Sequence, residues 1–193
     1  MPQLVDPHDV ILAGENSFLR LSRDRGKSES ERSSHWRVLW SPAGAGHVLF
    51  LQGALTDGEA RVYADNMGLA RWLQETIEVH LHAPFADARL AVRDAAFDRT
   101  GSAQSTVVER VVSSEDEVVM AWWDFLAPFV LTEPPGYGGR PLGVYTTFFP
   151  ARGAQLTLNG DPADGGLWFP ERHGRQASSA CLAWCETWVR PQG

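Results

Sequence analysis

A carboxylate stands between two indole side chains in the last segment of the chain, residues 179–190. If this segment is a β-strand, Trp184, Glu186 and Trp188 point to one face, because residues two apart share a face of a strand. A carboxyl group between indoles could bind a cationic or hydroxylated ligand through cation–π contacts and stacking. Burial beside the rings would raise the pKa of the carboxyl group, which suits proton transfer. The pattern thus predicts one wall of a ligand cavity.

A second pair of an indole and a carboxylate occurs in residues 117–125. Trp122 and Asp124 share a strand face there with Met120. This pair could bind a ligand and transfer protons in the same way as the carboxylate and indoles of the last segment. The structural alternative is that the tryptophan rings fill the core, since aromatic residues are the usual filling of a β core.

Glu109 and Arg110 fall on opposite faces of a Val-rich segment, residues 105–112, so one of the two charges faces inward if the sheet closes. An interior ion pair and a functional carboxylate in a pocket are the two interpretations of Glu109. The complete set of candidate catalytic residues is Asp124, Glu186 and Glu109, and the candidate ligand-binding residues are Trp122, Trp184, Trp188, Tyr145 and Met120.

A different chemistry is suggested by Glu78, His80 and His82, which would share one face of a strand. Two imidazoles at this spacing could hold a divalent metal ion, with a carboxylate as the third ligand. The His-x-His pair resembles the one found in cupin barrels, and the resemblance covers only these few residues. The structural alternative is a half-buried strand whose polar face is exposed to solvent. If the tryptophans and carboxylates line a ligand cavity, we expect no cofactor. If the His-x-His pair is a metal site, we expect a divalent metal.

The elements that must position these residues are mostly strands. Alternation with period two recurs from Trp36 onwards, with turn signals at residues 57–58, 98–101, 113–116 and 150–153. About nine or ten strands in one domain tend to curl into a barrel or bend strongly. The predicted fold class is therefore mainly β: an antiparallel meander closing into a barrel or strongly bent sheet, with one or two short helices. Its organisation resembles that of the lipocalins (calycins).

Several local features refine this prediction of a single domain over residues 1–193. Asn66 can cap a short amphipathic helix over residues 66–75, and a second short helix is expected around residues 17–21. Residues 22–35 contain no large apolar side chain before His35 and predict a mobile polar loop. Residues 142–149 and 155–158 are expected as separate strands around a turn.

Composition and charge narrow the classes of partner. The 193 residues carry 17 basic and 24 acidic side chains, a net charge of −7, and the arginines are scattered singly. Nucleic-acid binding needs a basic face, so we expect no nucleic-acid partner. The longest uncharged run, residues 38–56, is broken by Pro42 and two glycines and predicts no membrane segment. An exposed edge strand could pair two copies into a homodimer.

The two cysteines, Cys181 and Cys185, fall in the same predicted strand. Four extended residues span about 13 Å, beyond the reach of a disulfide. We therefore expect two free thiols, and the chain opens with no pattern of a secretory signal. Both observations favour a reducing, cytoplasmic location.

Three functions follow from these patterns. The first is binding of a small, largely apolar or aromatic molecule in a barrel cavity, with cofactor-free acid–base chemistry of the isomerase, hydratase or lyase type. The second is a metal-dependent, cupin-like barrel enzyme that uses the His-x-His pair. The third is a non-catalytic interaction domain with a filled interior. Whether the chain is an enzyme stays open at this point.

Overall fold

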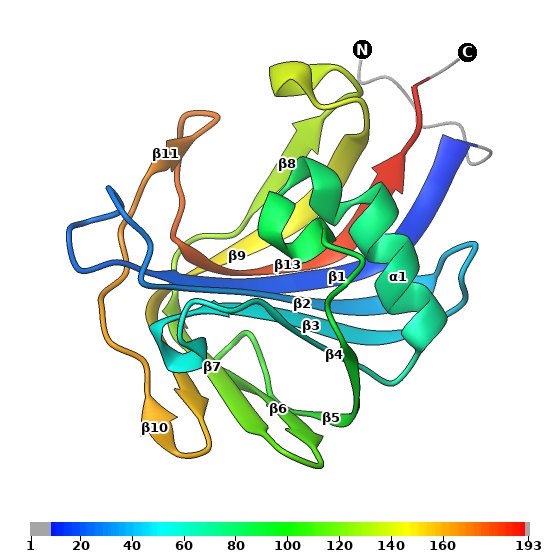
Figure 1. Ribbon diagram of the computed structural model, residues 1–193. Helices are drawn as coiled ribbons and strands as arrows, with labels where there is room; N and C mark the ends of the chain where they lie inside the picture. Colours follow the sequence, from blue (N-terminus) through cyan, green and yellow to red (C-terminus); the bar gives the residue numbers. More distant parts are fainter. Residues whose placement is uncertain (1–8, 192–193) are drawn as a thin grey trace.

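Long strands dominate residues 9–191, the part of the chain that the computed structural model describes (Figure 1). The strands are β1 (Val10–Leu21), β2 (Glu31–Trp40), β3 (Gly46–Gly53), β4 (Arg61–Ala64), β5 (Val92–Gly101), β6 (Thr106–Ser113), β7 (Glu117–Phe125), β8 (Phe129–Glu133), β9 (Gly143–Leu158), β10 (Asp161–Pro162), β11 (Glu171–Arg172), β12 (Arg175–Gln176) and β13 (Ala180–Val189). The helical segments are α1 (Met67–Thr76) and the 3-10 turns η2 (Ala54–Thr56), η3 (Glu78–His80), η4 (Ala83–Ala86) and η5 (Tyr137–Gly139).

Nine of the described strands close into a barrel. Their order is β9, β13, β1, β2, β3, β4, β5, β6 and β7, and the pairing of β7 with β9 completes the ring. Every pairing around the ring is antiparallel except that of β4 with β5. A parallel pair needs a crossover connection, and α1, η3 and η4 lie in that connection. The predicted mainly β barrel with short helices is confirmed.

The sequence signals for α1 and for the hairpin before it are confirmed. The backbone N–H of Leu69 donates to Oδ1 of Asn66 at 3.1 Å, so Asn66 is the N-cap of α1. Strands β3 and β4 pair antiparallel around Asp57 and Gly58, both of which have positive φ. Asp and Gly tolerate this backbone region, so they suit the turn.

The predicted short helix at residues 17–21 is wrong, since these residues belong to β1. Strand β2 begins at Glu31, so residues 31–35 of the polar stretch are also strand. Strand β2 pairs with β1 on one side and with β3 on the other. The backbone hydrogen bonds of residues 31–35 are thus satisfied although these residues have no large apolar side chain.

The two strands predicted at residues 142–149 and 155–158 are one continuous strand, β9. Its first half pairs with β13 and β8, and its second half pairs with β7. Pro150 lies at the change of partners, and its carbonyl accepts a hydrogen bond from the N–H of Leu126 at 2.8 Å. The proline therefore lies inside a long strand where the partner strand changes, and not in a turn between two short strands.

Side chains on the two faces of the sheet form two separate apolar clusters. The barrel cluster includes Leu19, Leu49, Leu51, Tyr63, Val107, Val111, Met120, Trp122, Leu156 and Leu182. The outer cluster includes Leu12, Trp36, Val48, Phe50, Leu69, Leu73, Ile77, Phe85, Phe148 and Trp188. Strands β6 and β7 contribute buried residues only to the barrel cluster, and α1 only to the outer cluster. The barrel interior is therefore filled by side chains, and the helical segments cover the opposite face.

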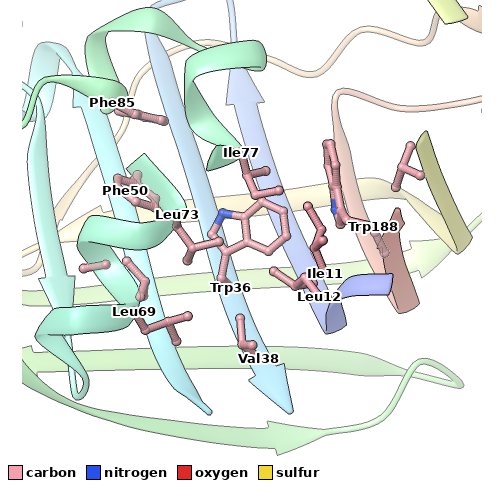
Figure 2. Packing of buried hydrophobic residues seen from close by; sticks show 14 of the residues in the cluster. Ile11, Leu12, Trp36, Val38, Phe50, Leu69, Leu73, Ile77, Phe85 and Trp188 are labelled. Atoms are coloured by element: carbon pink, nitrogen blue, oxygen red, sulfur yellow. The ribbon is translucent and has the colours of Figure 1, made fainter. Parts of the chain in front are cut away.

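The outer cluster centres on Trp36, which is fully buried. Figure 2 shows its ring between Ile77 of the helical connection and the strands, with Trp188 beside it. The centroids of the two indole rings are 6.1 Å apart. This contact joins β2 and β13 on the face that the helical segments cover.

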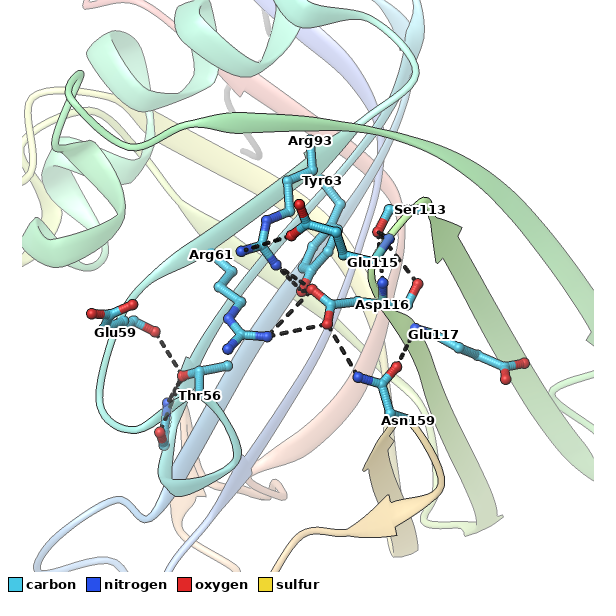
Figure 3. A network of polar contacts seen from close by, with 11 residues as sticks. Thr56, Glu59, Arg61, Tyr63, Arg93, Ser113, Glu115, Asp116, Glu117 and Asn159 are labelled. Carbon is cyan, nitrogen blue, oxygen red and sulfur yellow. Dashed lines mark hydrogen bonds and ion pairs between the residues drawn. The ribbon is translucent and has the colours of Figure 1, made fainter.

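A polar network around Asp116 reinforces the short parallel seam between β4 and β5 (Figure 3). Tyr63 donates its hydroxyl to Asp116 at 2.7 Å, Arg61 and Asn159 each donate at 3.2 Å, and Arg93 donates as well. The seam itself contains only three paired positions. Asp116 precedes β7 and Asn159 follows β9, so the network connects four strands at one end of the barrel.

Within residues 9–191, no helix has the length and apolar character needed to cross a bilayer.

Candidate functional site

A cavity of about 240 Å³ lies between the outer face of the sheet and the helical connection. Its lining comes from β1, β2, β8, β9 and β13, from the segment that contains η3 and η4, and from Arg140, which precedes β9, and Arg172 of β11. The apolar wall consists of Phe18, Leu81, Phe85, Leu131, Val144 and Phe148. This pocket lies on the face of the strands opposite the barrel cluster, so it is a different place from the barrel interior, where the sequence predicts a cavity.

Glu186 lines this pocket and is 4% exposed. The indole N–H of Trp188 donates to its Oε1 at 2.7 Å. Burial raises the pKa of Glu186 to about 8, although the bonds with Trp188 and Thr146 act to lower it. At neutral pH this carboxyl group is mostly protonated and can donate a hydrogen bond.

Trp184 does not share the face of Glu186 and Trp188, so that expectation is wrong. The register of β13 shifts between Trp184 and Thr187 against β9, and against β1 it shifts at the same place. Cys185 has φ 54°, in the left-handed region. This β-bulge inserts one residue and reverses the alternation. Trp184 consequently packs against the barrel cluster, while Trp188 belongs to the outer cluster.

Glu78 is the second carboxyl group of the pocket and is 1% exposed. Its Oε1 accepts the indole N–H of Trp36 at 2.7 Å and the hydroxyl of Ser34 at 3.1 Å. Burial raises the pKa of Glu78 to about 7, against these two hydrogen bonds, which act to lower it. Asn16 completes the chain by donating to the Ser34 hydroxyl at 3.0 Å.

The two carboxyl groups are held in similar ways. Each accepts an indole N–H on Oε1, and the two indoles, Trp36 and Trp188, contact each other. Oε2 of Glu78 forms no hydrogen bond with another residue between positions 9 and 191, whereas Glu186 also interacts with Thr146. The indole therefore fixes one oxygen of each group, and the second oxygen of Glu78 is available for a proton or a ligand.

Four arginine side chains also line the pocket: Arg20, Arg32, Arg140 and Arg172. Their side chains are 14–36% exposed, so they lie nearer to solvent than the two buried glutamates. Glu29 accepts two hydrogen bonds from Arg32, and Glu133 accepts hydrogen bonds from Arg140 and Arg172. The pocket thus combines buried acids, an apolar wall and a basic mouth.

Other predicted ligand-binding residues lie elsewhere. Trp122 and Met120 are fully buried in the barrel cluster, and Trp122 donates its indole N–H to the carbonyl of Phe18 at 3.1 Å. Tyr145 falls between two pocket-lining residues of β9, Val144 and Thr146, so alternation turns it to the other face. These three side chains do not line the pocket.

Asp124, a candidate catalytic residue, also lies outside the pocket. Its side chain is 60% exposed, and it forms an ion pair with Arg152 at 3.2 Å. Its backbone has φ 51°, so β7 is irregular at this position. A carboxylate this exposed contacts water and does not line the pocket.

Glu109, the remaining candidate, forms an interior ion pair in the barrel. It is 2% exposed and accepts a hydrogen bond from Arg99, which also donates to Glu15 at 2.5 Å. Nδ1 of His35 lies 3.6 Å from its Oε1. Burial acts to raise the pKa of Glu109, but His35 and Arg99 outweigh this effect and lower the pKa. Of the two interpretations of Glu109, the interior ion pair is therefore the one that matches its contacts.

The predicted metal ligands do not converge. Glu78 and His80 lie in the 3-10 turn η3 and His82 follows it, so the expected strand is wrong and the three side chains do not share a face. His80 is exposed, and Nε2 of His82 lies 2.8 Å from Oε1 of Gln52. Burial lowers the pKa of His82 to about 4. The described residues contain no group of three His, Cys, Asp or Glu side chains arranged to hold a metal ion.

Sequence reasoning missed the pocket residues of β1 and β2. Asn16, Phe18 and Arg20 lie two residues apart on one face of β1, so the period-two pattern of a strand could have identified them as neighbours.

Comparison of the chain with protein-family models, with curated proteins and with solved structures finds no significant match. The functional argument therefore rests on the geometry of the pocket.

Proposed function

We propose that the pocket binds a small, largely apolar or aromatic molecule and exchanges protons with it through Glu186 and Glu78, without a cofactor. The observation that carries this proposal is the pair of buried carboxyl groups in one cavity, with pKa values of about 8 and about 7. General acid–base catalysis is most effective when the pKa of the group lies near the working pH.

The size of the pocket supports a ligand of one ring with a substituent. An engineered apolar cavity of about 150 Å³ binds benzene, and the pocket here measures about 240 Å³. The wall includes three phenylalanine side chains, Phe18, Phe85 and Phe148, and the first and last of these have ring centroids 5.9 Å apart. Rings in such a wall favour edge and offset contacts with an aromatic ligand.

The different pKa values of the two carboxyl groups support a division of roles. At pH 7 about half of the Glu78 population is ionised and could remove a proton, while Glu186 is mostly protonated and could donate one. A ligand with a carbonyl group would accept the hydrogen bond of Glu186 and lose a proton from the neighbouring carbon to Glu78. This is the chemistry of a cofactor-free isomerase, hydratase or lyase.

Binding is tested with a panel of single-ring ketones and enones. Ligand binding should change the fluorescence of the tryptophans beside the pocket, and Glu186→Gln and Glu78→Gln should weaken it. Glu75→Gln is the matched control, because Glu75 is an exposed residue of the helix that precedes Glu78. A folded protein that responds to no member of the panel contradicts the binding proposal and leaves a non-catalytic interaction domain.

Proton exchange is tested separately by proton NMR in deuterated water. The protein should speed deuterium incorporation next to the carbonyl of a bound ketone, and Glu78→Gln should abolish this acceleration. Binding without accelerated exchange contradicts the catalytic part of the proposal and retains the binding part.

A further inference from the structure

One arginine at the mouth of the pocket lacks a hydrogen-bonded acid. Nη1 of Arg20 lies 3.7 Å from Oε1 of Glu29, which is too far for a hydrogen bond. Both oxygens of Glu29 already accept from Arg32, at 2.7 and 2.9 Å. The guanidinium of Arg20 makes no hydrogen bond with any residue from 9 to 191. Its donors are therefore available to a bound molecule.

The placement of Arg20 also works against the stability of the sheet. Arg20 on β1 stands directly opposite Arg32 on β2 in the antiparallel register. Like charges at directly opposed positions destabilise a sheet. Burial and the charges of Arg32 and Arg172 lower the pKa of Arg20, while Glu29 acts in the opposite direction. A bound anion would relieve this repulsion.

The balance of charge around the mouth points the same way. Four guanidinium groups line the pocket, and Glu29 and Glu133 are the carboxylates that accept hydrogen bonds from them. At neutral pH Glu186 is mostly protonated and Glu78 is about half ionised, so the two buried glutamates do not cancel the positive charge of the arginines. The mouth therefore keeps an excess of positive charge over an apolar wall.

We infer that the ligand of this pocket is a small aromatic or cyclic monocarboxylic acid. Its carboxylate binds the guanidinium of Arg20, which lies over the Phe18 ring and whose N–H groups donate to no residue from 9 to 191. The inference rests on the proposed function and adds the substrate class and the orientation of the ligand. The carboxylate lies at the mouth, the ring lies against Phe18 and Phe148, and the opposite end of the molecule meets Glu186 and Glu78.

A carboxylate fits better than a phosphate for two reasons. The planar fork of a guanidinium matches the two oxygens of a carboxylate in a bidentate pair. In addition, Arg32, Arg140 and Arg172 already donate to glutamates, so a single guanidinium remains for a single negative charge. A phosphate carries close to two charges and three acceptor oxygens at neutral pH, which one guanidinium does not satisfy.

The test compares acids with their neutral counterparts. Phenylacetate, hydrocinnamate and cinnamate are titrated calorimetrically against the wild-type protein, each beside its primary amide, and phenyl phosphate and inorganic phosphate are included. The variants are Arg20→Gln, Arg20→Lys and the control Arg23→Gln. Arg23 is a matched control because its side chain is 64% exposed and pairs with Asp164 away from the pocket lining.

We expect the wild type to bind at least one acid more tightly than its amide by roughly 10- to 100-fold, as charge-assisted hydrogen bonds imply. Arg20→Gln should remove this preference and leave the amide affinity unchanged, Arg20→Lys should keep part of it, and Arg23→Gln should keep all of it. Added salt should weaken the acid and not the amide. Circular dichroism verifies that Arg20→Gln is folded, as removal of a like charge predicts.

Three outcomes would overturn the inference. If acids and amides bind equally to the wild type, or if Arg20→Gln weakens both equally, the ligand carries no carboxylate at Arg20 although the proposed function stands. If phenyl phosphate or inorganic phosphate binds more tightly than every acid, the arginines serve a phosphate. If neither acids nor amides bind while a ketone or enone does, the inference fails and the proposed function stands; if none of these compounds binds, both fail.

Discussion

The free energy of unfolding should depend on pH through Glu186. In the unfolded chain its pKa returns to about 4.5, and in the folded protein it is about 8. The folded state thus holds a proton that the unfolded state has lost, so stability falls as pH rises toward 8 and levels off above it. One pKa unit corresponds to about 1.4 kcal/mol, so ionisation of Glu186 between pH 6 and pH 9 should remove about 3 kcal/mol.

The substitution Glu186→Gln isolates this effect. Glutamine resembles the protonated carboxyl group and cannot ionise, so the free energy of unfolding of the variant should gain about 3 kcal/mol on that of the wild type between pH 6 and pH 9. Glu78→Gln should show the same sign with about half the size, about 1.4 kcal/mol, because its folded pKa is about 7. His82 also titrates in this range in the unfolded state, but it is common to every variant and cancels from the differences.

The assay is urea unfolding followed by circular dichroism, repeated at pH 6, 7, 8 and 9. Glu75→Gln, on the exposed side of α1, should run parallel to the wild type at every pH. If the stability of Glu186→Gln falls with pH as steeply as that of the wild type, Glu186 does not hold a proton in the folded protein. The argument for a buried general acid would then fail.

Further predictions concern the barrel and the bulge. Asp116→Ala should lower the free energy of unfolding by about 2 kcal/mol, because it leaves Tyr63 and two arginines without their acceptor; Glu115→Ala, 68% exposed, should change it by less than about 0.5 kcal/mol, and equal losses would contradict the role of the network. Cys185→Val should destabilise by about 1–2 kcal/mol because β-branched residues resist positive φ, whereas Cys185→Gly should be tolerated; the reverse order in urea unfolding would argue against the bulge. A thiol reagent should label exposed Cys185 in the native protein and buried Cys181 only after denaturation, and rapid labelling of both would contradict the burial of Cys181.

The mainly β barrel could be predicted from the sequence because its signals are local. Alternation and turn residues identified most strands, and the cap at Asn66 with apolar residues at helical spacing identified α1. Glu186 and Trp188 were correctly paired because they lie two residues apart beyond the bulge. Each of these features depends on a few neighbouring residues.

The remaining features depend on contacts between distant segments. The bulge at Cys185 reverses the alternation, and a cysteine gives no sequence signal for positive φ. Glu78 reaches the pocket from a 3-10 turn, where period two does not apply. The basic mouth combines residues 20, 32, 140 and 172, which only the closed sheet brings together.

Because the sheet is packed on both faces, the side chains that form the barrel core differ from the side chains that would select a ligand. Strands β1, β2, β9 and β13 present one set of side chains to the barrel and an independent set to the cavity. Substitutions at Phe18, Leu131 and Phe148 should therefore alter selectivity while the side chains inside the barrel keep their packing. In natural evolution the same separation would let duplicated copies diversify toward new molecules before losing the ability to fold.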